Sequence, residues 1–377
     1  MISVVMPVFN KEKYVHNILK DLQKQTFQNF ECIIVDDGST DRSGIICDEV
    51  GLIDERFQVI HIKNAGVSYA RNVGLKEVRG NYITFIDADD RLESNYLKVL
   101  YEDITKSNAD IIISGVEKWW EKTNFTELLK IPYQGKYKMK ELLPKFAMVQ
   151  KNTGIYGYCW GKLLKKELIE EVYFTNGLKL AEDFDFYLQI YPKVDTIFFE
   201  NNCHYFYLQE AQNSSMLSAD NEIDYKAQLK INLRYRDFLK KMNSYNEYNR
   251  LLVDRILTNY VFFVVYHARR QEISKKVEET MSGLYWSDKK NIDKYKVSDF
   301  KIKDLNSTIK YHSKSKDFQV TSTYNYDYTC TTDIATYTSY VYKYSGSCKA
   351  TLKITYSIDN GNLKIKNVKL SEKQKRK

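Results

Sequence analysis

The chain has 377 residues, of which 43% are hydrophobic and 28% are charged. This composition excludes a disordered or fibrous protein, and the length suffices for two or three folded domains. The formal net charge of +8 indicates an affinity for anions, and by itself it fits nucleotide phosphates, nucleic acid and an acidic membrane surface equally well.

The cysteines and the apolar stretches indicate where the protein resides. The six cysteines include no Cys-x-x-Cys pair and no histidine at zinc-binding spacing, so we interpret them as reduced thiols. Met1 leads directly into the first expected strand, which leaves no room for a signal peptide. The longest apolar stretch, 260–266, is far shorter than the ~20 residues of a membrane-spanning helix. These features favour a cytoplasmic protein.

The first part of the chain alternates between strand and helix patterns. Short β-branched runs that end in turn residues predict strands over 2–9, 30–35 and 57–62. Apolar residues at helical spacing predict a helix over 14–22, and a second helix is expected to begin near 40–43. This alternation predicts a doubly wound, mostly parallel α/β sheet.

A fourth apolar run, 82–86, ends in three carboxylates within four residues, namely Asp87, Asp89 and Asp90. A buried strand with acids at its carboxyl end delivers them to the edge where open α/β sheets bind ligands. Carboxylates two residues apart at that edge can both reach a hard cation. The alternative is a solvated surface turn, because aspartate is common in turns.

Four segments stand in one order along the chain: Pro7–Asn10, Asp36–Ser39, Asn64–Asn72 and Asp87–Asp89. They resemble the Pro-x-Tyr/Phe-Asn loop, the Asp-Asp-Gly-Ser loop, the Gly-x-x-x-Ala-Arg-Asn segment and the Asp-x-Asp metal motif of family-2 glycosyltransferases. The resemblance covers about the first 220 residues. It implies the GT-A fold and inverting, nucleotide-sugar-dependent glycosyl transfer.

The resemblance also assigns a nucleotide-sugar site. UDP is the expected donor nucleotide, because it is the family's commonest. Its uridine is expected over the first loops, with Asp37 accepting a hydrogen bond from the base. Asp89 is the implied ligand of a divalent cation, Mn²⁺ or Mg²⁺, while Asp87 lies on the ribose or metal side and Asp90 helps to position them. The nucleotide-sugar-binding residues expected on this basis are Pro7, Val8, Phe9, Asn10, Asp37, Asn64, Arg71, Asp87 and Ala88.

Arg71 lies on a helix expected over 67–78, which begins beside Gly66. The start of a helix presents free backbone amides to anions, so this helix suits a nucleotide. Arg71 is expected to contact the nucleotide. An ordinary surface arginine is the alternative, because the chain has no glycine-rich phosphate loop of the Walker type.

The middle of the chain is expected to serve the acceptor. After a helix over 93–106 and a strand over 110–115, the insert 117–148 is rich in Lys, Tyr and Trp and is expected to shape the acceptor site. Within it, Trp119 and Trp120 either stack on sugar rings or pack against the protein. The segment 160–163 resembles the family's Trp-x-Lys-Leu segment, and a basic helix is expected to follow it.

Glu182 and Asp183 match the family's Glu-Asp motif at the start of an expected helix, where the helix dipole favours ionised carboxylates. The resemblance implies Asp183 as the catalytic base, with Glu182 holding it or binding the acceptor. The alternative is that both residues only supply negative charge to the first helical turn.

Two further regions follow the motifs. Residues 225–270 have a helical pattern whose basic and aromatic side chains suit either an anionic membrane surface or packing against the catalytic domain. From about Phe300 the composition shifts to Thr, Ser, Tyr and Lys with strand alternation, and Asp359–Asn362 predicts a hairpin turn. We therefore expect a catalytic domain at 1–220, a helical extension at 221–299 and a small β-rich module of unknown role at 300–377.

These observations favour a metal-dependent hexosyl- or N-acetylhexosaminyltransferase. Because the Gln-x-x-Arg-Trp motif of processive synthases is absent, one sugar per acceptor is expected. The expected acceptor is a cell-surface glycan or its lipid-linked precursor, which fits a cytoplasmic protein with peripheral contact at the inner face of the membrane. A homo-oligomer is compatible with the sequence.

Two functions other than glycosyl transfer are less compatible with the sequence. The alternative from another class is a non-catalytic glycan- or nucleotide-binding protein on the same fold, against which the intact Asp87, Asp89 and Asp183 argue. Nucleic acid is not an expected partner, because neither a recognised motif nor a clustered basic stripe is present.

Overall fold

The structure is a computed structural model of the chain, and it divides into two compact units, Met1–Gln271 and Glu272–Lys377. It describes residues 1–120, 123, 125–129, 131–209, 224–257 and 259–260 of the first unit. In the second unit it describes the backbone of the strands at 296–312, 317–334, 340–359 and 362–376.

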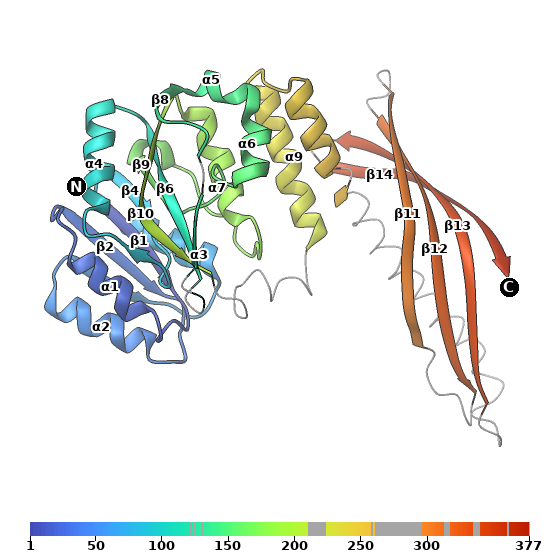
Figure 1. Ribbon diagram of the computed structural model, residues 1–377, viewed down its shortest axis with the longest axis horizontal. Coiled ribbons are helices and arrows are strands. Elements are labelled where there is room, and N and C mark those ends of the chain that lie inside the picture. Colours follow the sequence, from blue (N-terminus) through green and yellow to red (C-terminus); the bar gives the residue numbers. More distant parts are fainter. Residues whose placement is uncertain are drawn as a thin grey trace. The chain divides into compact units, whose positions relative to one another are not determined.

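A mixed sheet forms the centre of the first unit, and its described part has ten strands (Figure 1). The strand order is β3-β2-β1-β4-β9-β6-β10-β5, with β7 beside β6 and β8 beside β10. The strands are β1 Ile2–Val8, β2 Phe30–Asp36, β3 Phe57–His61, β4 Tyr82–Phe85, β5 Arg91–Leu92, β6 Ile111–Trp120, β7 Phe125–Leu128, β8 Gly135–Lys138, β9 Lys162–Lys165 and β10 Thr196–Leu208.

The expectation of a mostly parallel α/β sheet is confirmed for the strands that carry the motifs. β1 pairs in parallel with β2 and β4, β2 with β3, and β6 with β10. β9 is inserted between β4 and β6 and is antiparallel to both. A basic helix was expected after residue 163, and that expectation is wrong, because the chain continues as β9 and then forms a 3₁₀-helix at Lys166–Ile169.

The burial of β9 explains this difference. Leu163 and Leu164 point to opposite faces of the sheet and are both fully buried. A short strand in the middle of a sheet is covered on both faces and therefore reads as a continuous apolar run. Four residues are too few to distinguish such a strand from a helical turn by periodicity.

Helices cover both faces of the parallel strands. Val4 and Met6 of β1 belong to the same apolar cluster as Ile18 and Leu22 of α1. Val5 faces the other way, toward α3, where a side chain at Gly74 would come within 2.6 Å of it. The helices of this part are α1 Val15–Gln23, α2 Ser43–Ile53, α3 Val67–Glu77, α4 Tyr96–Ser107, α5 Met139–Leu142, α6 Phe146–Thr153 and α7 Glu182–Ile190.

The helical extension packs on this domain through α9, Tyr225–Lys241. Phe238 is buried, and its ring centroid lies 5.2 Å from that of Phe146. Arg234 forms an ion pair with the buried Asp185 of α7. The packing alternative is therefore right for α9.

The helical pattern expected over 225–270 is interrupted at 242–246, and the helix resumes over 247–257. Phe262, Phe263, Arg269 and Arg270, which the membrane alternative also invoked, lie outside the described residues. Within the described residues, every helix is too short or too polar to cross a membrane.

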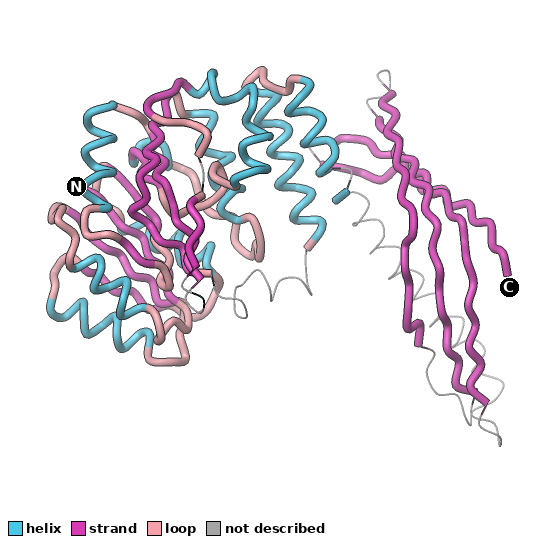
Figure 2. Tube along the Cα trace, in the orientation of Figure 1, coloured by secondary structure: helices cyan, strands magenta, loops and turns pink. Residues whose placement is uncertain are grey.

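The second unit contains an antiparallel sheet of four long strands in its described part (Figure 2). They are β11 Lys296–His312, β12 Asp317–Ile334, β13 Tyr340–Asp359 and β14 Asn362–Arg376. Asp359 pairs with Asn362, as a hairpin requires, while the two turn residues between them lie outside the described residues. The domain boundaries near 220 and 299 stay predictions.

Candidate active site

The first and second loops meet at one edge of the sheet, because β1 and β2 are parallel and each loop follows the carboxyl end of its strand. The side-chain oxygen of Asn10 accepts a hydrogen bond from the Thr40 backbone at 2.8 Å, and the Asn10 backbone N–H donates to Ser39 Oγ at 3.0 Å. The Asp37 N–H donates to the Val8 carbonyl at 2.8 Å. These bonds hold the two loops in a fixed arrangement.

Asp37 ties the second loop to the segment before α3. It is 3% exposed, and its two carboxylate oxygens accept the backbone N–H groups of Ala65 at 2.7 Å and Gly66 at 2.9 Å. Gly38 has a φ of +72°, and a Cβ there would lie 2.7 Å from the Asn64 nitrogen. Each carboxylate oxygen has a further lone pair, so Asp37 can still accept the expected hydrogen bond from a base, which stays a prediction.

The remaining loop residues differ in how they can face a ligand. Phe9 is 44% exposed, Asn10 and Asn64 are exposed, and Pro7 is half-buried. The side chains of Val8 and Ala88 belong to the apolar core. These last two residues can therefore contribute only backbone atoms to a nucleotide-sugar site.

Arg71 of α3 is the centre of the site. It is 3% exposed, so the alternative of a surface arginine is wrong. Its Nη1 donates to Asp183 Oδ1 at 2.8 Å and to Glu182 Oε1 at 3.1 Å, and its Nη2 donates to Asp87 Oδ1 at 3.1 Å. Burial disfavours the guanidinium charge, but the carboxylates of Asp183, Asp87 and Glu182 outweigh this and raise the pKa of Arg71.

The two acids at the start of α7, Glu182 and Asp183, interact electrostatically. Burial and the adjacent Asp183 raise the pKa of Glu182 to about 8, against the opposite effect of Arg71. Glu182 is therefore mostly protonated at neutral pH. Asp183 uses its second oxygen to accept the Cys159 backbone N–H at 3.2 Å. A buried carboxyl group with a raised pKa beside the proposed base suits acid–base chemistry.

The three acids of the Asp motif have different surroundings. Asp90 is 1% exposed and accepts hydrogen bonds from the Tyr205 hydroxyl and, at 3.0 Å, from the Leu208 N–H. It therefore joins the motif to β10. The side chains of Asp87 and Asp89 are 27% and 28% exposed, but Asp87 is held by Arg71 and Asp89 pairs with Lys11 Nζ at 2.5 Å.

These surroundings bear on the expected metal. Among the described residues, no group of three or more His, Cys, Asp or Glu side chains is arranged to hold a metal ion. Mg²⁺ and similar cations at nucleotide sites are commonly bound by one or two carboxylates, with phosphate and water oxygens completing the shell. The half-buried Asp89 carboxylate fits a cation that arrives with a diphosphate.

Lys162 is a residue near Asp183 whose role the sequence motifs did not predict. It is 1% exposed, its Nζ donates to the Tyr158 carbonyl and it lies 4.5 Å from the centre of the Tyr187 ring. Burial lowers the pKa of Lys162 to about 7. The only sequence signal for it was its place in the Trp-x-Lys segment, next to the Cys159 amide that binds Asp183.

The insert residues Trp119 and Trp120 are half-buried, and the Trp120 ring lies 5.3 Å from that of Phe125. This contact supports packing for Trp120, while sugar stacking by either tryptophan stays a prediction.

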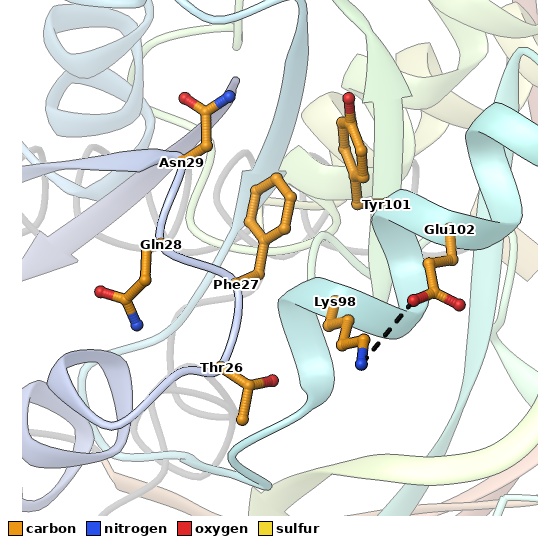
Figure 3. Close-up of a pocket in the computed structure, with 7 residues that line it drawn as sticks. All are labelled: Thr26, Phe27, Gln28, Asn29, Lys98, Tyr101 and Glu102. Atoms are coloured by element: carbon orange, nitrogen blue, oxygen red, sulfur yellow. Dashed lines mark ion pairs between the residues drawn. The ribbon is translucent and has the colours of Figure 1, made fainter.

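A cavity of about 510 Å³ lies at a different place (Figure 3). The rings of Phe27 and Tyr101 line it with their centroids 4.5 Å apart, and Lys98 pairs with Glu102 at 3.9 Å. Its residues 26–29 precede β2, whereas Asp37 follows β2, so the cavity lies at the opposite end of this strand from the motif loops.

Comparison with known proteins gives a family match. The family described as "Glycosyl transferase family 2" matches residues 3–172. Two proteins of Streptococcus pneumoniae serotype 4 are 35% identical to the chain. Glycosyltransferase GlyG aligns over 214 residues, 55% of this chain and 70% of GlyG. Glycosyltransferase GlyA aligns over 219 residues, 55% of this chain but only 30% of GlyA.

A solved structure shares the fold. The crystal structure of Staphylococcus aureus TarS 1–349 with UDP-GlcNAc aligns with a TM-score of 0.53 and 22% identity, over 69% of this chain and 71% of that one. TarS is a poly(ribitol-phosphate) β-N-acetylglucosaminyltransferase and is 27% identical over 222 residues, 58% of this chain and 37% of TarS. At this identity the structural match concerns the fold alone.

Proposed function

The chain belongs to glycosyl transferase family 2 and is a glycosyltransferase, and from this premise we propose that it transfers a single sugar from a UDP-sugar, with inversion and with a divalent cation. The proposed acceptor is a hydroxyl group of a cell-surface glycan or of its lipid-linked precursor. The sugar is proposed to be a hexose or an N-acetylhexosamine.

One observation carries this proposal. The buried guanidinium of Arg71 binds Asp87 of the Asp motif on one side and Glu182 and Asp183 of α7 on the other. The Asp motif is the proposed place of the nucleotide diphosphate, and Asp183 is the proposed base for the acceptor. The arginine thus brings the acids for the two substrates to one point, at the edge of the sheet where α/β proteins bind ligands.

The proposed chemistry is direct displacement at the anomeric carbon. Asp183 accepts the proton of the acceptor hydroxyl as that oxygen attacks, and the sugar–phosphate bond breaks on the opposite side, which inverts the configuration. Glu182 holds Asp183 in place or binds the acceptor. A divalent cation held by Asp89, when bound, neutralises charge on the leaving diphosphate.

The nucleotide and the acceptor are supported by what related proteins bind. The TarS structure contains UDP-GlcNAc, and TarS acts on poly(ribitol phosphate). The net charge of +8 suits anionic nucleotides and an anionic membrane surface alike. The proposed position is cytoplasmic, at the inner face of the membrane.

The decisive experiment is a screen of nucleotide sugars for hydrolysis without acceptor, with Mn²⁺ and with chelator. We expect metal-dependent release of UDP from at least one UDP-sugar. A protein that binds UDP and hydrolyses or transfers no sugar would support the binding-protein alternative instead.

We expect Asp89→Asn to weaken Mn²⁺-dependent UDP binding by about tenfold or more, because an anionic oxygen ligand becomes neutral at nearly constant size. Calorimetric titration of UDP with and without Mn²⁺ measures this. Asp237→Asn is the matched control, since Asp237 is exposed on α9 and pairs with Arg236. Equal UDP affinities in the parent and Asp89→Asn would mean that Asp89 does not hold the cation.

We expect removal of the second unit, with the chain ending at Gln271, to preserve UDP-sugar hydrolysis, because every motif residue lies before this point. Acceptor turnover or oligomeric size should decrease, because we propose that the second unit contributes to acceptor binding or to self-association. A product assay and light scattering measure these. A folded shortened protein that no longer binds UDP would contradict the first expectation. Unchanged turnover and unchanged size would remove the role proposed for the second unit.

A further inference from the structure

Lys11 makes a contact that the proposed mechanism does not use. Its ammonium group lies 2.5 Å from Asp89 Oδ2, in an ion pair whose side chains are 33% and 28% exposed. Burial lowers the pKa of Lys11, but Asp89, Asp87 and Asp90 together raise it above its ordinary value. Lys11 is therefore a cation facing all three acids of the motif.

Hydrogen bonds hold the backbone of Lys11, and its side chain makes the contact with Asp89. The Lys11 N–H donates to Ser43 Oγ at 2.7 Å, and its carbonyl accepts the N–H groups of Tyr14 and Val15, both at 2.8 Å. These bonds fix the start of α1. The four-carbon stem of a lysine allows its ammonium to reach different partners from one backbone position.

Asp89 is the acid of the motif that is proposed to hold the cation. Both oxygens of Asp90 accept hydrogen bonds from β10, and Asp87 binds Arg71. In the part of the chain that the structure describes, no other clustered side chains are placed to complete a metal site. A metal ion without nucleotide would therefore have to displace an ammonium group from its main protein ligand.

We propose that Lys11 is a resident counter-cation that occupies Asp89 in the nucleotide-free protein and moves to the diphosphate when a divalent cation and a nucleoside diphosphate bind together. This inference rests on the proposed function and names a residue that controls the order in which metal and nucleotide bind. The metal alone meets a competing cation, whereas the metal with its diphosphate offers the ammonium a new anionic partner. Metal and nucleotide should consequently increase each other's affinity.

The test measures binding and does not depend on turnover. Lys11→Met removes the charge and keeps an unbranched apolar stem. Free Mn²⁺ is titrated by electron paramagnetic resonance without nucleotide, and UDP is titrated by calorimetry at saturating Mn²⁺. We expect Lys11→Met to bind Mn²⁺ alone about tenfold more tightly than the parent, because the ammonium no longer competes for Asp89. We expect it to bind UDP about tenfold more weakly, because the ammonium no longer contacts the diphosphate.

Three controls define the effect. Lys13→Met removes the same charge two residues away, where the ammonium bonds the Tyr14 hydroxyl, and should leave both affinities near parental values. In an Asp89→Asn background, Lys11→Met should no longer strengthen Mn²⁺ binding, because the two residues act through one contact. Lys11→Arg, which keeps a cation, should resemble the parent.

The outcomes separate this inference from the proposed function. If Lys11→Met binds Mn²⁺ alone no more tightly than the parent, the inference is overturned whatever the nucleotide result. If Mn²⁺ binding strengthens but UDP affinity is unchanged, the movement to the diphosphate is wrong. If the parent binds no UDP at all, the proposed nucleotide fails, while the Mn²⁺ titration still decides whether Lys11 competes for Asp89.

Discussion

Asp183→Asn is expected to lower kcat by ~10²–10⁴-fold, the usual effect of losing a general base. The substitution keeps the size of the side chain and removes its basicity. UDP affinity should hardly change, because the proposed nucleotide contacts are made by other loops. The measurements are kcat with acceptor and the calorimetric affinity for UDP, and a loss confined to kcat indicates an interaction made in the transition state.

The contacts of Asp183 require a stability control. Its oxygens accept from Arg71 Nη1 and from the Cys159 N–H, both of which are hydrogen-bond donors. An asparagine can satisfy only one of them with its single oxygen, which costs about 1–3 kcal/mol of stability. Unfolding by urea should therefore be measured on the same preparation, so that lost activity is not confused with lost fold.

Glu182→Gln is the comparison that tests the assignment of the base. This variant should retain more transfer than Asp183→Asn, since Glu182 is mostly protonated at neutral pH and a glutamine preserves a neutral hydrogen-bonding group. If Glu182→Gln abolishes transfer while Asp183→Asn turns over acceptor at a near-parental rate, the base has been assigned to the wrong residue.

Arg71→Met is expected to lower the free energy of unfolding by about 3–5 kcal/mol at pH 8, the usual result of removing one partner from a buried ionic group. Methionine has a similar unbranched length but leaves Asp87, Glu182 and Asp183 without their shared cation. Guanidinium-induced unfolding measures the change. Arg255→Met, an exposed substitution on the 247–257 helix, should stay within about 0.5 kcal/mol of the parent.

The loss caused by Arg71→Met should depend on pH. Arg71 lowers the pKa of Glu182, which burial and Asp183 already raise to about 8. In the parent, the folded pKa of about 8 lies above the unfolded pKa of about 4.5, so stability decreases as pH rises toward 8. Removing the arginine raises the folded pKa further, so the variant continues to lose stability above pH 8, where the parent levels off. The loss should therefore be larger at pH 9 than at pH 6. A variant as stable as the parent at pH 8 would mean that these carboxylates do not need Arg71.

Local features of the sequence were sufficient for the architecture around the site. Strand periodicity and turn residues act over a few positions, and they correctly predicted the parallel strands β1 to β4 and the order of the motif loops. The helices between them were predicted to within a few residues for the same reason. A strand that is short and covered on both faces, as β9 is, lacks such a local signal.

The connections within the site were decided only by the tertiary structure. Arg71 is 111 and 112 residues from Glu182 and Asp183, and Lys11 is 78 residues from Asp89. The sequence by itself determined which acids stand at the ends of strands and helices, because that depends on neighbouring residues. It did not determine which cation each acid binds or which acid is buried, because burial and ion pairing arise when distant elements pack and exclude water between them.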